Sequence, residues 1–221
     1  RRAELAAHLE AWLEGSNADA LRTDATWGGV VPSRGVVDPG ADYGAGFYND
    51  HHFHYGYFVY AAAVLAKGDA AWAARWAPAV THLIRDIANP SDDDPLYPPM
   101  RHKDWFVGHS WAGGLFPSAS GRNQESTSEA VNAWYAIALF GEATGDQRLA
   151  LLGRTLLATV RDPGVLIIRT LAAMALQKHL RGLRARKSVS DKAEMVKQQR
   201  RSLVVGDGGA EERKARPLRA L

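Results

Sequence analysis

Apolar residues recur at spacings of three and four in five stretches of the chain, which is the pattern of helices that bury one face. These stretches cover residues 3–14, 51–67, 70–88, 126–142 and 146–159. Trp72, Trp76 and Trp134 lie in mid-helix at apolar positions, so we assign them to the core. No convincing alternation of the strand type precedes residue 160. The pattern therefore predicts an all-α fold.

Long connections rich in Gly, Pro, Asp and aromatic residues separate these helices. They cover residues 16–48, 89–100 and 101–114. Glycine permits tight turns and a close approach of the backbone to a ligand. Irregular stretches of this length are uncommon in compact domains and are often functional. We therefore expect a helical bundle or toroid whose loops carry the function.

Charge and aromatic content both change near residue 159. Residues 1–159 contain 12 Lys and Arg against 18 Asp and Glu, whereas residues 160–221 contain 15 against 6. All 20 aromatic residues lie at or before Phe140. The acidic, Trp-rich part fits a neutral carbohydrate better than a nucleic acid. We interpret residues 160–221 as a solvated, poorly ordered basic tail; binding of nucleic acid or of a membrane surface by the tail is the alternative.

Several classes of protein have no motif in this chain. It contains no cysteine, which excludes disulfides and thiolate metal sites. It contains neither GxxxxGK[ST] nor GxGxxG for phosphate binding, and no GxSxG nucleophile elbow. No apolar run approaches the ~18–20 residues of a membrane helix. We therefore expect no cofactor, no nucleic-acid partner and no membrane partner for the folded part.

The densest group of polar and aromatic side chains is YNDHHFHYGYFVY, residues 48–60. Aromatic rings that stack on sugar rings, together with side chains that bond sugar hydroxyls, are typical of a carbohydrate site. The candidate sugar contacts in this stretch are Tyr48, His51, His54 and Tyr55.

Asp50 lies at the start of the predicted helix 51–67, and this leaves two roles open. As a helix cap its carboxylate would be stabilised as the anion. As a general acid it would need a pKa above the reference value of ~3.9. His51 and His54 raise a third hypothesis, a metal site, although the known zinc pattern on a helix places two His four residues apart. We expect them to hydrogen bond a substrate and expect no metal.

Two later stretches supply further candidates. In GRNQESTSEAVN, residues 121–132, Glu125 and Glu129 lie four apart. Ser126 and Glu129 also fit a capping box, so for Glu129 a capping role and a site role are both open. The remaining candidate sugar contacts come from this stretch and from RHKDWFVGHSWAGG, residues 101–114. They are Asp104, Trp105, His109, Trp111, Asn123 and Gln124.

Three motifs in register, YNDHHFHYGYF, RHKDWFVGHSWAGG and GRNQESTSEAVNAWY, resemble glycoside hydrolase family 81 over about residues 1–159. The resemblance implies an incomplete (α/α)6 barrel, or toroid, as the catalytic domain over residues 1–159. It also implies an extracellular endo-β-1,3-glucanase, or laminarinase, whose partner is β-1,3-glucan. We expect a monomer. Residues 160–221 depart from the family, as a shifted reading frame or a truncated gene would produce.

Carried over by position, the resemblance implies that Asp50 is the general acid, Glu125 the general base and Glu129 an assisting carboxylate. It also implies hydrolysis with inversion, in which the two main carboxyl groups stand ~6.5–9.5 Å apart to admit a water. Two alternatives remain open at this point. One is a non-catalytic or decayed β-glucan-binding fragment, and the other is a metal-dependent enzyme that uses His51 and His54.

Overall fold

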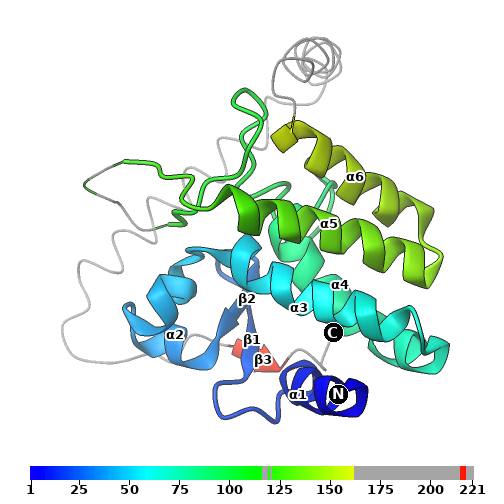
Figure 1. Cartoon of the computed structure of the whole chain (residues 1–221). Helices are drawn as coiled ribbons and strands as arrows, with labels where there is room; N and C mark the ends of the chain where they lie inside the picture. The colour runs from blue at the N-terminus through cyan, green and yellow to red at the C-terminus, as the bar shows by residue number, and fades with distance from the viewer. Residues whose placement is uncertain (116–118, 120, 162–214, 218–221) are drawn as a thin grey trace. The chain divides into compact units, whose positions relative to one another are not determined.

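The computed structural model of the chain describes residues 1–115, 119, 121–161 and 215–217 (Figure 1). All the described secondary structure belongs to one compact unit. The predicted basic tail, with its proposed origin in a shifted frame or a truncation, lies outside the described residues except at 160, 161 and 215–217. No helix among the described residues is long and apolar enough to cross a membrane.

The five predicted helices are present, which confirms the helical fold class. Gly15 and Gly145 adopt left-handed backbone and end the first and fourth of them. The side chains of Asp69 and Ser126 cap the starts of two helices. The helices are α1 (Arg2–Glu14), α3 (His51–Ala66), α4 (Ala70–Ala88), α5 (Thr127–Thr144) and α6 (Gln147–Arg161).

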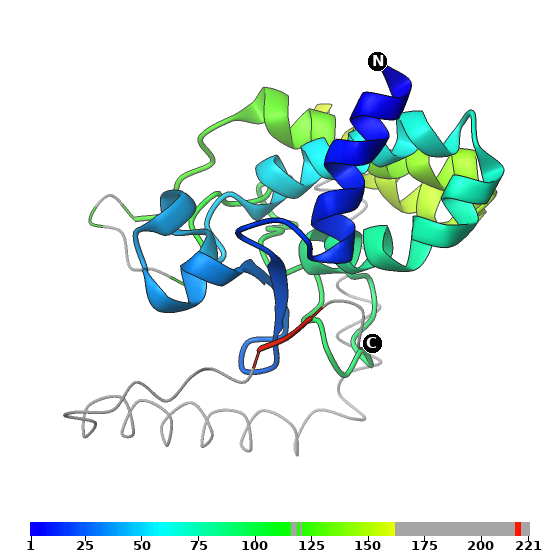
Figure 2. The same ribbon diagram turned by 90° about the horizontal axis from the view of Figure 1, so that it is seen from below.

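The connection at residues 16–48 contains structure that its sequence did not reveal. β1 (Leu21–Asp24) and β2 (Gly29–Pro32) form an antiparallel hairpin, and β3 (Ala215–Pro217) pairs with the other edge of β1 (Figure 2). α2 (Ser33–Val37) and the 3-10 helix η1 (Ala41–Phe47) follow the hairpin. The expectation of no strand before residue 160 is therefore wrong. The two hairpin strands have four residues each and β2 is buried throughout, so neither strand shows a clear alternation of apolar and polar residues.

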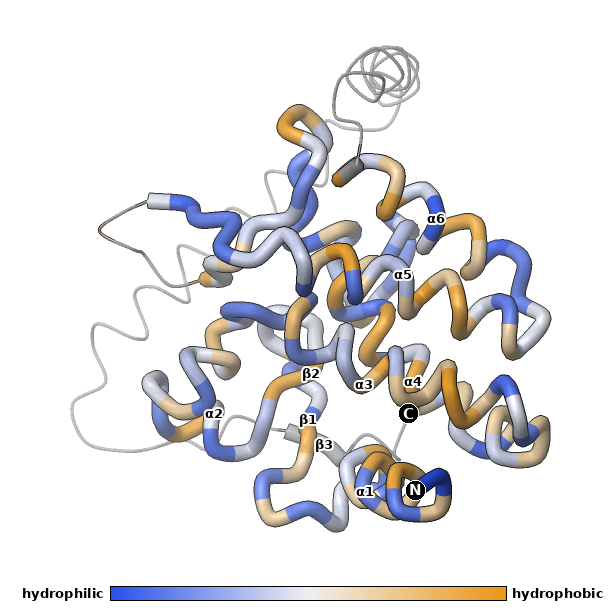
Figure 3. Tube along the Cα trace, in the orientation of Figure 1, coloured by the Kyte–Doolittle hydropathy of each residue, from blue (hydrophilic) through white to orange (hydrophobic). Residues whose placement is uncertain are grey.

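The main apolar core lies among the helices. α3 contacts both α4 and α5, and α6 packs on α5. Apolar residues recur along α5 and α6 in Figure 3. Trp72, Trp76 and Trp134 are 8%, 4% and 0% exposed, which confirms their assignment to the core.

The N-terminal halves of α3 and α5 meet at a contact between small residues. A Cβ atom added at Gly56 of α3 would lie 2.7 Å from the Cβ of Ala133 and 2.9 Å from its Cα. Glycine in a helix interior is less stable than alanine by about 1 kcal/mol. The close approach of the two helices explains why a glycine stands here. It also brings the polar residues at the two helix starts together.

Replacing Gly56 with alanine tests this contact. Helix propensity alone predicts a gain in stability, but the overlap with Ala133 would force α3 and α5 apart. We expect Gly56→Ala to lower the free energy of unfolding by about 1–3 kcal/mol in urea titrations. Gly113→Ala is the control, because a Cβ there would meet nothing within 4 Å. A Gly56→Ala chain as stable as the natural one would refute the packing argument.

Candidate functional site

The three sequence motifs meet where α3 and α5 begin. The backbone N–H of Asp50 donates to the carbonyl of Ala112 at 2.9 Å, and the N–H of Ala112 donates to the carbonyl of Asn123 at 2.8 Å. The side-chain oxygen of Asn49 accepts from the N–H of Gly114 at 2.8 Å. Segments far apart in the sequence are thus joined directly around Asp50.

Asp50 and Glu125 both have left-handed backbone, with φ of 58° and 60°. Residues other than glycine rarely adopt this conformation. Each such position costs on the order of 1–3 kcal/mol and persists only when the surrounding structure imposes it. Backbone strain at both proposed catalytic residues favours a functional site over an ordinary surface.

The carboxylate of Asp50 is not used to cap α3. Asp50 occupies the N-cap position, but its side chain makes no capping hydrogen bond. Burial raises its pKa, and the negative charges of Glu125 and Glu129 raise it further, while His54 and His51 act in the opposite direction. A raised pKa is what a general acid requires. Of the two roles left open by the sequence, this environment favours the proton donor.

Only half of the predicted capping box forms at the start of α5. The hydroxyl of Ser126 accepts from the backbone N–H of Glu129 at 3.4 Å. The N–H of Ser126 donates to the carbonyl of Gln124 instead of to Glu129. The Glu129 carboxylate accepts from the hydroxyl of Tyr57 on α3, at 3.1 Å. It therefore points across the helix contact toward the element that carries Asp50.

Glu125 is exposed, as is Asn123, whose side-chain amide donates to the Glu125 carboxylate at 3.2 Å. The amide of Gln124 donates to the hydroxyl of Thr127 at 3.0 Å. Glu125 and Asn123 are thus open to water and to a ligand, whereas Gln124 also supports the start of the helix.

Three of the predicted sugar contacts lie inside the protein. Tyr48, His51 and Tyr55 are 0%, 0% and 3% exposed. The phenol of Tyr48 donates to the carboxylate of Asp24 at 3.0 Å, and that of Tyr55 donates to the carbonyl of Val30 at 2.7 Å. Burial raises the pKa of both phenols, so they remain neutral donors. For these three residues the prediction of sugar contact is wrong, because their side chains are enclosed and their polar atoms have partners within the fold.

His51 supports the site from within the core. Its Nε2 lies 2.7 Å from the carbonyl of Ala45, and its Nδ1 lies 2.6 Å from the carboxylate of Asp86. A carbonyl oxygen only accepts, so Nε2 carries a proton and both ring nitrogens are committed. The metal hypothesis therefore loses one of its two proposed ligands. No group of three or more His, Asp and Glu that could hold a metal ion occurs among the described residues.

Four predicted contacts are half-buried in the loop at residues 101–114. Asp104 accepts from two backbone N–H groups of this loop and from the indole N–H of Trp111, the last at 3.2 Å. Burial raises the pKa of Asp104, but these hydrogen bonds outweigh it and the net pKa is lowered. Asp104 thus shapes the loop as an anion, and the loop holds partly exposed rings beside it. The four residues are Asp104, Trp105, His109 and Trp111.

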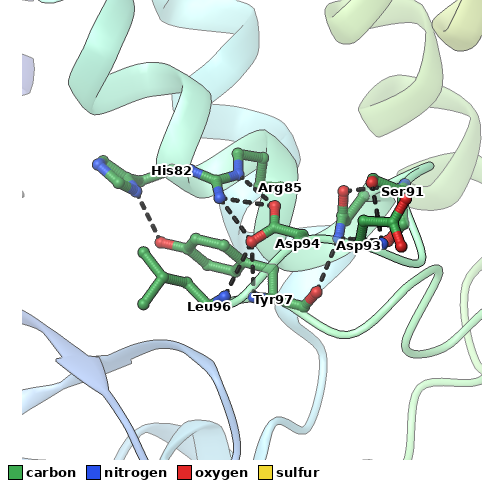
Figure 4. A network of polar contacts seen from close by, with 8 residues as sticks. His82, Arg85, Ser91, Asp93, Asp94, Leu96 and Tyr97 are labelled. Atoms are coloured by element: carbon green, nitrogen blue, oxygen red, sulfur yellow. Dashed lines mark hydrogen bonds and ion pairs between the residues drawn. The ribbon is translucent and has the colours of Figure 1, made fainter.

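A polar network orders the connection that leads into this loop (Figure 4). The guanidinium of Arg85 on α4 bonds both carboxylate oxygens of Asp94, at 2.6–2.8 Å. Asp94 also accepts from the backbone N–H groups of Leu96 and Tyr97. The phenol of Tyr97 lies 2.8 Å from a ring nitrogen of His82. The turn-rich segment is therefore fixed to α4, and so is the start of the loop that follows.

Sequence reasoning missed Tyr57 and Asp42, and it did not predict the contact that Lys103 makes. Tyr57 lies seven residues after Asp50, so helical periodicity alone would have placed it on the same face. Asp42 lies 3.8 Å from Nδ1 of the half-exposed His54, but no sequence signal indicates that pair. The ammonium group of Lys103 donates to Thr159 of α6 at 2.6 Å, which ties the loop to that helix. Burial lowers the pKa of Lys103 to about 8.

Comparison with known proteins relates this arrangement to one family. A family model described as Glycosyl hydrolase family 81 C-terminal domain matches residues 1–163. A glucan endo-1,3-beta-D-glucosidase of Glycine max is 47% identical over 152 residues, which cover 68% of this chain and 23% of the relative. A glucan endo-1,3-beta-D-glucosidase of Acetivibrio thermocellus is 45% identical over 169 residues, which cover 73% of this chain and 20% of that relative.

A solved structure agrees with these sequence relatives. The glycoside hydrolase family 81 protein of Clostridium thermocellum is 42% identical and superposes with a TM-score of 0.64, covering 72% of this chain and 22% of that one. The chain thus spans less than a quarter of the length of each of these relatives.

The raised pKa of Asp50 makes its ionisation unfavourable to folding. Its contribution to stability is therefore full at acid pH and is lost as the pH rises through the pKa of the folded state. Asp50→Asn removes this effect, so we expect the unfolding temperature near neutral pH to rise by about 2 °C. The gain should disappear as the pH approaches about 3. Thermal unfolding followed by circular dichroism across this range measures both.

Asp104→Asn is the matched control, for which we expect a change in stability of the opposite sign at neutral pH. The lowered pKa of Asp104 means that its contribution is present at neutral pH and is lost as the pH falls through its folded pKa. This variant should be less stable than the natural chain at neutral pH and equal to it in acid. Shifts of the same sign for the two variants at neutral pH would contradict the assigned environments.

Proposed function

Because this chain belongs to glycoside hydrolase family 81, we propose that it is the part of an endo-β-1,3-glucanase that carries the catalytic carboxylates. Its substrate would be internal β-1,3-glucosidic bonds of laminarin-like glucans. The Glycine max and Acetivibrio thermocellus relatives bear the name glucan endo-1,3-beta-D-glucosidase. The observation that carries the proposal is the junction of the loops before α3 and α5, which places the half-buried Asp50 within the electrostatic influence of Glu125 and Glu129.

In the proposed reaction, neutral Asp50 donates its proton to the glycosidic oxygen as the bond to the anomeric carbon breaks. Ionised Glu125 accepts a proton from a water that attacks the same carbon from the opposite face. The product is inverted, Asp50 is left as an anion and Glu125 is left protonated. Proton exchange with solvent restores both groups. Glu129 assists by its charge, which favours the protonated form of Asp50 before the next turnover.

The same proposal assigns the glucan to the side chains that the structure leaves accessible. The half-buried rings of Trp105 and Trp111 would stack on glucose units, and His54 and Asn123 would bond their hydroxyls. We further propose that the protein acts outside the cell as a monomer and without a cofactor. In support of a wall substrate, a relative from Schizosaccharomyces pombe, 43% identical over 149 residues, is named primary septum glucan endo-1,3-beta-D-glucosidase.

A second candidate function is binding of β-1,3-glucan without turnover. The half-buried rings of Trp105 and Trp111 favour it, because stacking on glucose units requires no proton transfer. The accessible aromatic rings and polar side chains would suffice for such binding.

Release of reducing ends from laminarin, compared with a β-1,4-glucan, tests the proposed activity. We expect hydrolysis of laminarin alone, with the α-anomer as the first product in proton NMR spectra. Asp50→Asn and Glu125→Gln should each lower the rate by about 10²-fold or more. Glu142→Gln is the control, since Glu142 is an exposed carboxylate of α5 that pairs with Arg154.

Each alternative result has a distinct meaning. Full activity in Glu125→Gln would refute the assignment of the base, and a β-anomer as first product would refute inversion. Retention of the chain on insoluble β-1,3-glucan, with no reducing ends released over hours, would establish the binding function instead.

A further inference from the structure

Tyr57 forms a hydrogen bond that involves neither the proposed acid, Asp50, nor the proposed base, Glu125. It is 53% exposed, yet its phenol is engaged, because the hydroxyl donates to the Glu129 carboxylate at 3.1 Å. This hydrogen bond raises the pKa of Tyr57. The bond runs from α3 to α5, so it joins the helix that begins at Asp50 to the helix that follows Glu125.

The backbone geometry brings the phenol within reach of α5. Tyr57 lies two helical turns after Asp50 and immediately after Gly56, whose missing side chain lets α3 approach Ala133. Because the helices are this close, a tyrosine on α3 spans the distance to a glutamate on α5. A tyrosine side chain has few rotatable bonds, so it holds a partner at modest loss of entropy.

Glu129 needs such a partner to act at a defined distance. Its negative charge acts on Asp50, as does that of Glu125, and repulsion from an ionised Asp50 would turn a free glutamate toward solvent. Among the described residues, Tyr57 supplies the side-chain donor that opposes this rotation. A hydrogen bond from a neutral donor also stabilises the ionised form of the carboxylate.

We propose that Tyr57 is a positioning residue of this site, whose phenol holds the Glu129 carboxylate beside Asp50 across the contact of α3 and α5. The role of Tyr57 in catalysis rests on the proposed function. The hydrogen bond to Glu129 and its effect on the pKa of Asp50 are independent of that function, so they can be measured in a chain that turns over no substrate.

The charged and titratable groups that face Asp50 determine what removal of the phenol does. These groups are Glu125 and Glu129 from the α5 side, and His54 and His51 from α3. In Tyr57→Phe the Glu129 carboxylate loses its donor and turns toward solvent. The pKa of Asp50 should then fall, because less negative charge remains near it.

Titration of the side-chain carboxyl carbon of Asp50 by ¹³C NMR of the whole chain measures its midpoint. We expect Tyr57→Phe to move the Asp50 midpoint down by a few tenths of a pH unit. Tyr60→Phe is the matched control, because Tyr60 is a 39% exposed tyrosine of the same helix. It should leave the Asp50 midpoint unchanged. An unchanged Asp50 midpoint in a folded Tyr57→Phe chain would overturn the proposal.

A double-mutant cycle tests whether the effect passes through Glu129. In a Glu129→Gln background, Tyr57→Phe should move the Asp50 midpoint no further. An equal shift in that background would overturn the proposal. A measurement that leaves Tyr57 in place gives the same information: phenolate absorbance should show a raised pKa for Tyr57 in the natural chain and its ordinary value in Glu129→Gln.

The two proposals fail in different ways. A shifted Asp50 midpoint in Tyr57→Phe, in a chain that releases no reducing sugar, would refute the proposed hydrolase and leave the role of Tyr57 intact. Glucan hydrolysis with an unshifted Asp50 midpoint would refute the role of Tyr57 and leave the proposed hydrolase intact.

Discussion

A buried hydrogen bond between Asp86 and His51 fixes the position at which the chemistry is proposed. Asp86 on α4 accepts from the backbone N–H of Val30 in β2 and holds the first residue of α3, whose other ring nitrogen is bonded to the carbonyl of Ala45 in η1. Three elements, α4, β2 and α3, therefore meet at one carboxylate, and the imidazole of His51 links them to η1. Removal of one partner of a buried hydrogen bond leaves the other polar group unsatisfied, which destabilises a protein by about 1–3 kcal/mol. Because Asp50 directly precedes His51, its place depends on this pair.

Two further constraints complete the geometry around that anchor. The contact of Gly56 with Ala133 sets the separation of α3 and α5, and thus the separation of the elements that carry the three carboxylates. The backbone hydrogen bonds from Asp50 to Ala112, and from Ala112 to Asn123, connect the loops in front of both helices. The raised pKa of Asp50 follows from this arrangement, because burial and two like charges act on it together.

The sequence predicted the parts of the fold that extend over many residues and the region where the site lies. Five helices carry long periodic patterns, whereas β1 and β2 have only four residues each and β2 is buried throughout, so neither shows a clear alternation. The site prediction went wrong where residues were chosen by type alone, without considering which side of helix α3 each side chain faces. His51 and Tyr55, four apart, face the core, while Asp50, His54 and Tyr57 follow one another at spacings of four and three along the accessible side. Contacts such as Asp42 with His54 depend on tertiary structure, and no local pattern encodes them.

The left-handed backbone at Asp50 and Glu125 has a consequence for how this protein would change under artificial selection. Both positions would be relaxed by glycine, and the like charges around Asp50 would be relieved by loss of any one carboxylate. Substitutions that abolish the chemistry therefore tend to make the chain more robust. A library screened for heat resistance alone would admit changes at these residues, so a programme aimed at the proposed activity has to screen for turnover at the same time.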